Sequence, residues 1–341
     1  MRRQYIDYLK AYGCIAIVVL HVISNSLIRI TVSDKYYFCL SGMLVLTRWA
    51  VPIFIMASGC NLLGRENEFE IAKRHSLHVL KLVLVWGILY EFIDPVIDLL
   101  KSRPVADPID ILLHLYQGTA EPLWFCFMII GLYVLIPIIN RIIADKKICQ
   151  YFLFVATVSA TLMPILSEIE SSIPLVGVIV SHTRFPNFGV FICYFVLGYY
   201  IDRNADFSEK RRRTLYMLSA LSVVIMIAYG IICGAYFGKS DALTNPNDIT
   251  IVILSIGIFV FFKYDFKPGK GYPIIAKIAK ESLGIYLMHA YLIMRLFGKG
   301  IHALMLHPFL AVPAVSVLVF VLCFAASCLL RKIPGIRNLL L

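Results

Sequence analysis

Residues 5–26 constrain the chain most, because they combine the composition of a membrane helix with ionisable side chains. Nearly every side chain from 11 to 22 is apolar, which is typical of a helix that spans a bilayer. The same stretch carries Lys10 and His21. Titratable groups at membrane depth are costly, and by default they face other protein groups or a water-filled cavity. The pattern therefore predicts a first helix that lines a site.

Helical geometry places Lys10 and His21 on one face of this helix. Eleven residues at 100° per residue make about three turns, so the two side chains lie roughly 16 Å apart along the axis. Asp7 lies near the same stripe. Asp7 and Lys10 also admit a plainer interpretation as an interfacial pair. His21 lies ~15 Å inside the apolar run, so we expect a functional role for it, with a structurally satisfied histidine as the alternative.

The composition excludes an ordinary soluble protein. The chain has 341 residues, of which 60% are hydrophobic and 16% are charged, whereas soluble domains are about one quarter charged. We therefore predict an all-α polytopic membrane protein, with residues 1–341 forming a single integral membrane domain and no soluble domain. The basic start could be mistaken for a signal peptide, but no small-residue cleavage site follows the apolar run, so we expect an uncleaved first helix.

The apolar segments predict ten transmembrane helices and their orientation. The candidate spans are 8–28, 39–63, 76–100, 122–143, 150–168, 186–202, 214–237, 248–263, 281–298 and 308–330. With a cytoplasmic N-terminus, basic residues are about threefold more frequent in the cytoplasmic segments than in the opposite ones, which favours cytoplasmic N- and C-termini. The fifth span is the weakest of these predictions. Without it the chain would have nine spans, and every later segment would lie on the opposite side of the membrane. Topology thus accounts for the net charge of +11, and we expect no nucleic-acid partner.

The sequence carries no motif for metal or covalent serine chemistry. The nine cysteines are scattered, mostly inside predicted spans, and show no CxxC or Cys/His spacing. We expect them to be small packing residues, with no metal site and no disulfide framework. The chain also has no GxSxG, GxGxxG, Walker-type or HExxH motif.

The third span opens with the basic segment KRHSLHVLK, residues 73–81. Arg74, His78 and Lys81 are separated by four and three residues, so they can share one helix face. A cytoplasmic anchor is the plainer interpretation of this segment. The alternative is a basic wall for a ligand that carries phosphate groups.

Four further side chains in the spans admit both a structural and a functional interpretation. Ser58 beside Gly59 either allows close helix packing or leaves room for a substrate chain. Glu121 could bind a polar acceptor, or it could simply lie at the water boundary. Trp124 fits an aromatic belt on the outer side. His289, deep in the ninth span, is either hydrogen-bonded to a neighbour or functional.

Five segments, in order along nearly the whole chain, resemble the acyltransferase-3 family. This family comprises integral membrane acyltransferases of bacteria that modify cell-surface glycans and lipids. The segments are YIDYLKAYGCIAIVVLH, PIFIMASGCNLL, LWFCFMIIGLYVLIP, YFVLGYYI and SLGIYLMH. The first is similar to the family's first helix, in which ten residues separate a basic residue from a histidine. The resemblance implies a multi-pass protein of the bacterial cytoplasmic (inner) membrane.

The resemblance also implies roles for individual residues. His21 would be the general base, and Lys10 would help to hold an acyl-CoA donor near the cytoplasmic face. The third helix departs from the family pattern of two basic residues three apart followed by a proline. Arg74 fits the first position, but Leu77 occupies the second and Lys81 stands in place of the proline. His78 or Lys81 would have to replace the missing cation.

The chemistry of acyl transfer fits these residue types. Moving an acyl group from a thioester to a hydroxyl needs a base that works near neutral pH, and histidine is that side chain. It also needs cations for the phosphates of the donor, which Lys10 and Arg74 can supply.

We therefore predict a membrane O-acyltransferase. It would move an acyl group, acetyl by default for a narrow site, from acetyl-CoA or another acyl-CoA on the cytoplasmic side. The acceptor would be a hydroxyl of an envelope glycan, a lipid-linked sugar or a similar molecule. Acyl-CoA would be a co-substrate, and no tightly bound cofactor is expected.

Two other classes of function remain open at this level. The chain could be a transporter or flippase for a polar metabolite or a lipid-linked saccharide, with Lys10, His21 and His289 along the pathway. The sequence shows no pair of interrupted helices in equivalent halves, which is the usual sign of such a transporter. The third possibility is a receptor or assembly component in which the polar side chains only pack.

Overall fold

The computed structural model is all-helical over the residues that it describes, which are 3–100, 123–170, 188–237, 248–335 and 340. Each predicted apolar segment forms a helix or a pair of helices there. They are α1 (Gln4–Leu27), α2 (Tyr37–Val45), α3 (Ala50–Leu62), α4 (Glu68–Leu100), α6 (Leu123–Val134), α7 (Ile136–Ile143), α8 (Lys146–Glu170), α10 (Phe188–Arg203), α11 (Glu209–Phe237), α12 (Ile249–Val260), the π-helical turn η1 (Phe261–Asp265), α13 (Tyr272–Phe297) and α14 (Pro308–Leu330).

Two predicted spans are each divided into two helices in the structure, although α2 and α3 together (Tyr37–Leu62) still count as one candidate membrane span. The segment 39–63 turns between α2 and α3, where Thr47 Oγ1 donates to the carbonyl of Leu44 at 2.7 Å and competes with the helical pattern. The segment 122–143 bends by 57° between α6 and α7. Pro137 lies in the first turn of α7, a position that suits proline because its missing N–H would have no intrahelical partner there.

Length and composition support fewer spans than the sequence predicts. Five helices of the described part are long and apolar enough to cross a membrane, or six if the bent pair α6–α7 is one span. The helices α10 and α12 have 16 and 12 residues, fewer than the ~20 that a perpendicular crossing requires. Ten crossings and cytoplasmic ends therefore stay predictions.

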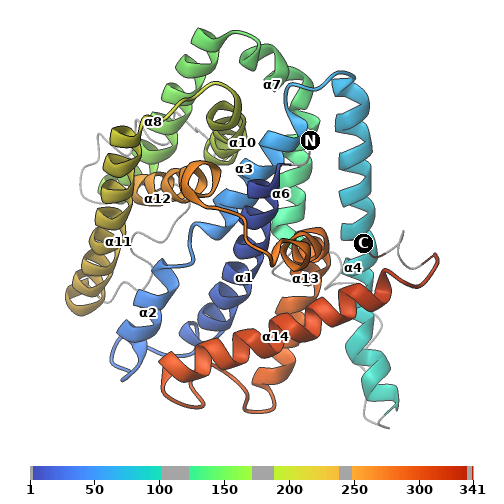
Figure 1. The fold of residues 1–341 in the computed structure, drawn as a ribbon. Coiled ribbons are helices and arrows are strands. Elements are labelled where there is room, and N and C mark those ends of the chain that lie inside the picture. The colour runs from blue at the N-terminus through green and yellow to red at the C-terminus, as the bar shows by residue number, and fades with distance from the viewer. Residues whose placement is uncertain (1–2, 101–122, 171–187, 238–247, 336–339, 341) are drawn as a thin grey trace.

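The first helix lies at the centre of the molecule, with α4 and α11 at opposite edges (Figure 1). It packs against α2, α3, α13 and α14. Of its most apolar stretch 72% is buried inside the protein, compared with 17% for α11. This difference shows that the polar stripe of α1 faces protein, while α11 presents its apolar side chains outward.

Helices α1 and α13 lie parallel, in a register set by polar contacts. These contacts recur every seven residues along α1, which is the spacing of a helix–helix seam. They are Tyr272 Oη to Asp7 Oδ2 at 2.7 Å, Cys14 Sγ to the carbonyl of Ser282 at 3.9 Å, and His289 Nε2 to His21 Nδ1 at 3.1 Å. Because the residue numbers of the contacting pairs rise together on α1 and α13, the two helices run in the same direction.

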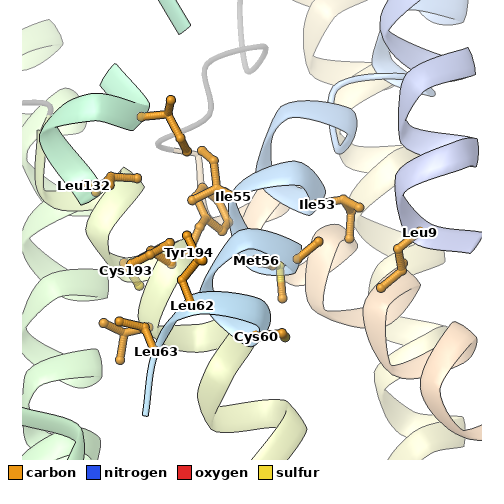
Figure 2. Close-up of a cluster of buried hydrophobic side chains, with 14 of the residues drawn as sticks. Leu9, Ile53, Ile55, Met56, Cys60, Leu62, Leu63, Leu132, Cys193 and Tyr194 are labelled. Carbon is orange, nitrogen blue, oxygen red and sulfur yellow. The ribbon is translucent and has the colours of Figure 1, made fainter. Parts of the chain in front are cut away.

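Glycines bring α3 and α10 into backbone contact. A Cβ at Gly59 would lie 1.8 Å from the carbonyl oxygen of Phe195, and a Cβ at Gly198 would lie 2.2 Å from that of Met56. Cys60 donates to the carbonyl of Gly198 at 3.1 Å, which fits the predicted packing role of the cysteines. Figure 2 shows the side chains of α3 between Leu9 on one side and Leu132, Cys193 and Tyr194 on the other.

A buried carboxylate at the end of α10 anchors the start of α1. Asp202 forms an ion pair with Arg3 and accepts a hydrogen bond from Tyr5 Oη at 2.5 Å. Lys263 of η1 donates to the carbonyl of Ile201 at 2.6 Å. The last carbonyls of a helix lack intrahelical partners, so a lysine there stabilises the helix end.

The glycine contacts generate a prediction about stability. Gly59→Ala should lower stability by about 1–3 kcal/mol, because the added methyl forces α3 and α10 apart. The measurement is the midpoint of thermal unfolding in detergent. Gly230→Ala is the matched control, since nothing lies within 4 Å of a Cβ there and alanine favours a helix. Equal midpoints for the two variants would contradict the close-packing argument.

Candidate active site

A cavity of about 170 Å³ lies against the polar stripe of α1. Its walls come from five helices, and most of the side chains are apolar. The lining residues are Lys10 and Ile17 of α1, Phe54 and Ser58 of α3, Val79 of α4, Phe125, Cys126, Ile129 and Tyr133 of α6, and Ser282, Leu283 and Tyr286 of α13.

One end of the cavity is rich in cations. His75 of α4 lies within electrostatic range of Arg65, Arg74, His78 and Lys10. The ring of His75 lies 5.8 Å from the ring of Tyr133, which lines the cavity. The basic start of α4 therefore adjoins Lys10, although 64 residues separate Lys10 from Arg74 in the chain. Phosphate groups could bind here, because several cations converge at one place.

The other end of the cavity adjoins a pair of histidines. His289 Nε2 lies 3.1 Å from His21 Nδ1, and the ring centroids are 4.7 Å apart. Ile17 and Tyr286, which line the cavity, each lie one helical turn before a histidine. The pair thus lies immediately beyond the apolar part of the cavity.

Backbone carbonyls determine which ring nitrogens of the pair carry hydrogen. His289 Nδ1 lies 2.5 Å from the carbonyl of Tyr286, and His21 Nδ1 lies 2.9 Å from that of Ile17. Since a carbonyl only accepts, both Nδ1 atoms donate. In neutral His289, Nε2 is then an acceptor, and it shares the single Nδ1–H of His21 with the carbonyl of Ile17. The basic nitrogen of neutral His21 is therefore Nε2, the atom that could accept a proton from a substrate.

The structure brings several predicted residues together at this cavity. Lys10 and Ser58 line the cavity, so Ser58 fits the interpretation that the Ser58–Gly59 pair leaves room for a substrate chain. Gly59 packs against α10 and fits the other interpretation, close helix packing. His78 and Lys81 are half-buried on α4 within electrostatic range of each other. Leu77, which replaces the second cation of the family pattern, points outward with 54% of its surface exposed.

Other predicted residues lie away from the cavity or outside the described residues. Asp7 is buried and accepts a hydrogen bond from Tyr272, which gives it a structural partner. Trp124 is 47% exposed on the surface of α6, with its ring 6.1 Å from that of Phe125. Glu121 lies outside the residues that the structure describes.

Sequence reasoning did not select several residues that the structure places at the site. They are His75, Phe125, Tyr133 and Tyr286. His75 stands inside the basic segment of the third span, so its residue type was a usable signal. The aromatic residues lie in segments that resemble the family, but their residue type alone does not say whether an aromatic side chain in an apolar helix faces a cavity or lipid.

Among the described residues, no group of three His, Cys, Asp or Glu side chains could hold a metal ion. Comparison with known families gives a match over residues 3–328 to the acyltransferase-3 model, which is described as an acyltransferase domain. The chain belongs to the acyltransferase-3 family. No curated protein and no solved structure matches it significantly.

Membership of the acyltransferase-3 family confirms the resemblance and makes the protein a membrane acyltransferase. It also implies two partners in general terms, a lipid bilayer and an acyl donor. The nature of the donor, the acceptor and the roles of single residues are taken up below as proposals.

The contact between the two histidines predicts that a substitution at His289 affects kcat more than KM. His289→Phe removes one of the two acceptors of the His21 Nδ1–H and leaves only the Ile17 carbonyl, so kcat should fall ~10–100-fold, as for other residues that orient a functional side chain. The KM for the acyl donor should change little. His289→Asn should recover part of kcat, because an amide can both accept from His21 and donate to the Tyr286 carbonyl.

These constants are measured by release of thiol from an acyl-CoA, with protein homogeneity in detergent checked beside each variant. A His289→Phe protein with wild-type kcat would show that the contact has no role in catalysis. Equal losses in the Phe and Asn variants would assign His289 a purely structural role.

Proposed function

We propose that the protein transfers an acyl group from acyl-CoA to a hydroxyl of an envelope glycan, a lipid-linked sugar or a similar acceptor. The observation that carries the proposal is one apolar cavity with cations at one end and a histidine pair at the other. An acyl-CoA donor matches these two ends, because its phosphates are charged and its thioester end is neutral.

The size of the cavity supports a short acyl group. At about 170 Å³ it is smaller than the ~300–1,000 Å³ of pockets that enclose drug-sized ligands. The nucleotide of CoA therefore stays outside, against Lys10, Arg74 and the half-buried His78 and Lys81. Only the thioester arm and its acyl group enter between the apolar walls, and acetyl is the smallest group of this kind.

His21 is the general base of the proposed reaction. Its Nε2 takes the proton of the acceptor hydroxyl as that oxygen attacks the thioester carbonyl. The new C–O bond forms, the C–S bond breaks, and the leaving thiolate takes the proton back from His21. During these steps His21 is transiently cationic, and His289 stabilises the cation by accepting its Nδ1–H bond.

The proposed site has a direction across the membrane. The donor enters at the Lys10 end, which we assign to the cytoplasmic face of a bacterial inner membrane because basic residues favour cytoplasmic segments. The acceptor approaches His21 from the other side. The parallel α1 and α13 support this arrangement, because both helices then carry their histidines to the same depth.

The first test is acyl transfer from radiolabelled acetyl-CoA by detergent-purified protein. Water and an extract of bacterial envelope glycans serve as acceptors. Wild type should transfer label or slowly hydrolyse the thioester. His21→Ala should lose ~100-fold or more, within the ~10²–10⁴-fold that general bases contribute.

Inert wild-type protein that also binds no CoA would contradict the proposal. Transport assays in vesicles would then be the next experiment, since a transporter moves its substrate without a thioester. Activity that is equal in wild type and His21→Ala would leave acyl transfer standing but remove His21 as its base.

The cationic end yields a separate prediction about donor binding. Lys10→Ala and Arg74→Ala should each raise the KM for acetyl-CoA about tenfold with little change in kcat, because a phosphate contact is the same in ground and transition states. Lys299→Ala is the control, since Lys299 is exposed beyond the opposite end of α13. An unchanged KM in both cavity-end variants would exclude this end as the donor site.

A further inference from the structure

Two aromatic rings line the cavity near its histidine end. Phe125 of α6 and Tyr286 of α13 have ring centroids 5.3 Å apart, and the rings are inclined at 55°. The Tyr286 ring in turn lies 5.4 Å from that of His289. Both Phe125 and Tyr286 line the cavity. The rings therefore belong to the part of the cavity wall that lies nearest to the histidine pair.

The same helix that carries Phe125 spans the cavity from end to end. Tyr133, at the cationic end beside His75, follows Phe125 by eight residues, a rise of ~12 Å. On α1, Lys10 precedes Ile17 by seven residues, a rise of ~10 Å. A donor with its phosphates at Lys10 thus extends along both helices and brings its acyl group to the ring pair.

We propose that Phe125 limits the length of the acyl group that the protein transfers, so that the donors are short-chain acyl thioesters. The proposal rests on the proposed function and adds its size-selecting residue. A longer chain would have to displace the ring against Tyr286 and Trp124, whose rings it contacts. Moving a packed ring is costly, and one methylene too many in an apolar pocket costs tenfold or more in kcat/KM.

Phe125 is the member of the pair that a substitution can test cleanly. It is half-buried and has no polar side-chain atom, so its replacement leaves no unsatisfied group behind. Tyr286 differs, because its ring lies 5.4 Å from that of His289 and it also carries a polar hydroxyl. Changes at Tyr286 would therefore mix chain-length selection with the geometry of the histidine pair.

The experiment compares acetyl-CoA, butyryl-CoA and hexanoyl-CoA as donors, with water as acceptor and release of CoA thiol as the signal. Wild type should prefer acetyl to butyryl in kcat/KM by tenfold or more. Phe125→Ala should reduce this ratio at least tenfold, chiefly by raising the butyryl rate. Phe125→Leu removes less volume, so it should give a smaller shift in the same direction and should fold if the alanine variant does not.

Two matched variants on α6 separate this effect from general loosening. Phe127→Ala truncates a ring on the outer face of the helix, where 56% of the side chain is exposed, and should keep the wild-type ratio. Ile129→Ala enlarges the cavity one turn nearer to the cationic end. It should change the ratio much less than Phe125→Ala does.

Three outcomes would overturn the proposal. An unchanged acetyl-to-butyryl ratio in both Phe125 variants shows that this ring does not select chain length. Equal shifts in Phe125→Ala and Ile129→Ala assign the limit to the cavity as a whole. Wild type that releases no CoA from any donor removes the proposed acyl transfer itself, whereas active protein with an unchanged ratio removes only the chain-length role of Phe125.

Discussion

The polar seam between α1 and α13 is the interaction on which the site depends. Inside a bilayer no water is present to satisfy polar side chains, so each one must find a protein partner. Asp7, Cys14 and His21 do so at seven-residue intervals along α1, with partners on α13. These contacts set the register of two parallel helices, and the register decides that His21 meets His289. A shift by one turn would separate the rings and leave buried polar atoms unsatisfied, which makes the arrangement a well-defined one.

The cavity exists because neighbouring helices pack closely on one side of α1 and diverge on another. Gly59 and Gly198 allow α3 and α10 to touch through their backbones, and this contact turns Ser58 toward the cavity. On the opposite wall, α6 runs past the cavity and then bends away into α7. Small residues and a proline contribute little to hydrophobic burial. They nevertheless determine where the helices leave a cavity between the large apolar side chains.

Separation of charge from the reactive groups is the main chemical property of the site. The cations gather where α4 begins, and the histidine pair lies at the far end of an apolar passage. The phosphates of the proposed acyl-CoA donor need never enter the low-dielectric part, where burying them would be very costly. The neutral thioester can enter, and the histidines there share one hydrogen bond whose direction is set by two backbone carbonyls.

The sequence by itself determined the helical segments, and for the last span it predicted the bounds that α14 has. It also identified Lys10 and His21 as residues of one helix face, because helical periodicity is a local property. Periodicity says which face a side chain occupies but not which helix that face meets. The partner of His21 is 268 residues away in the chain, and it was the tertiary structure that chose His289. For the same reason Phe125, Tyr133 and Tyr286 lie in segments that resemble the family, but only packing decided that their faces enclose a cavity and do not face lipid.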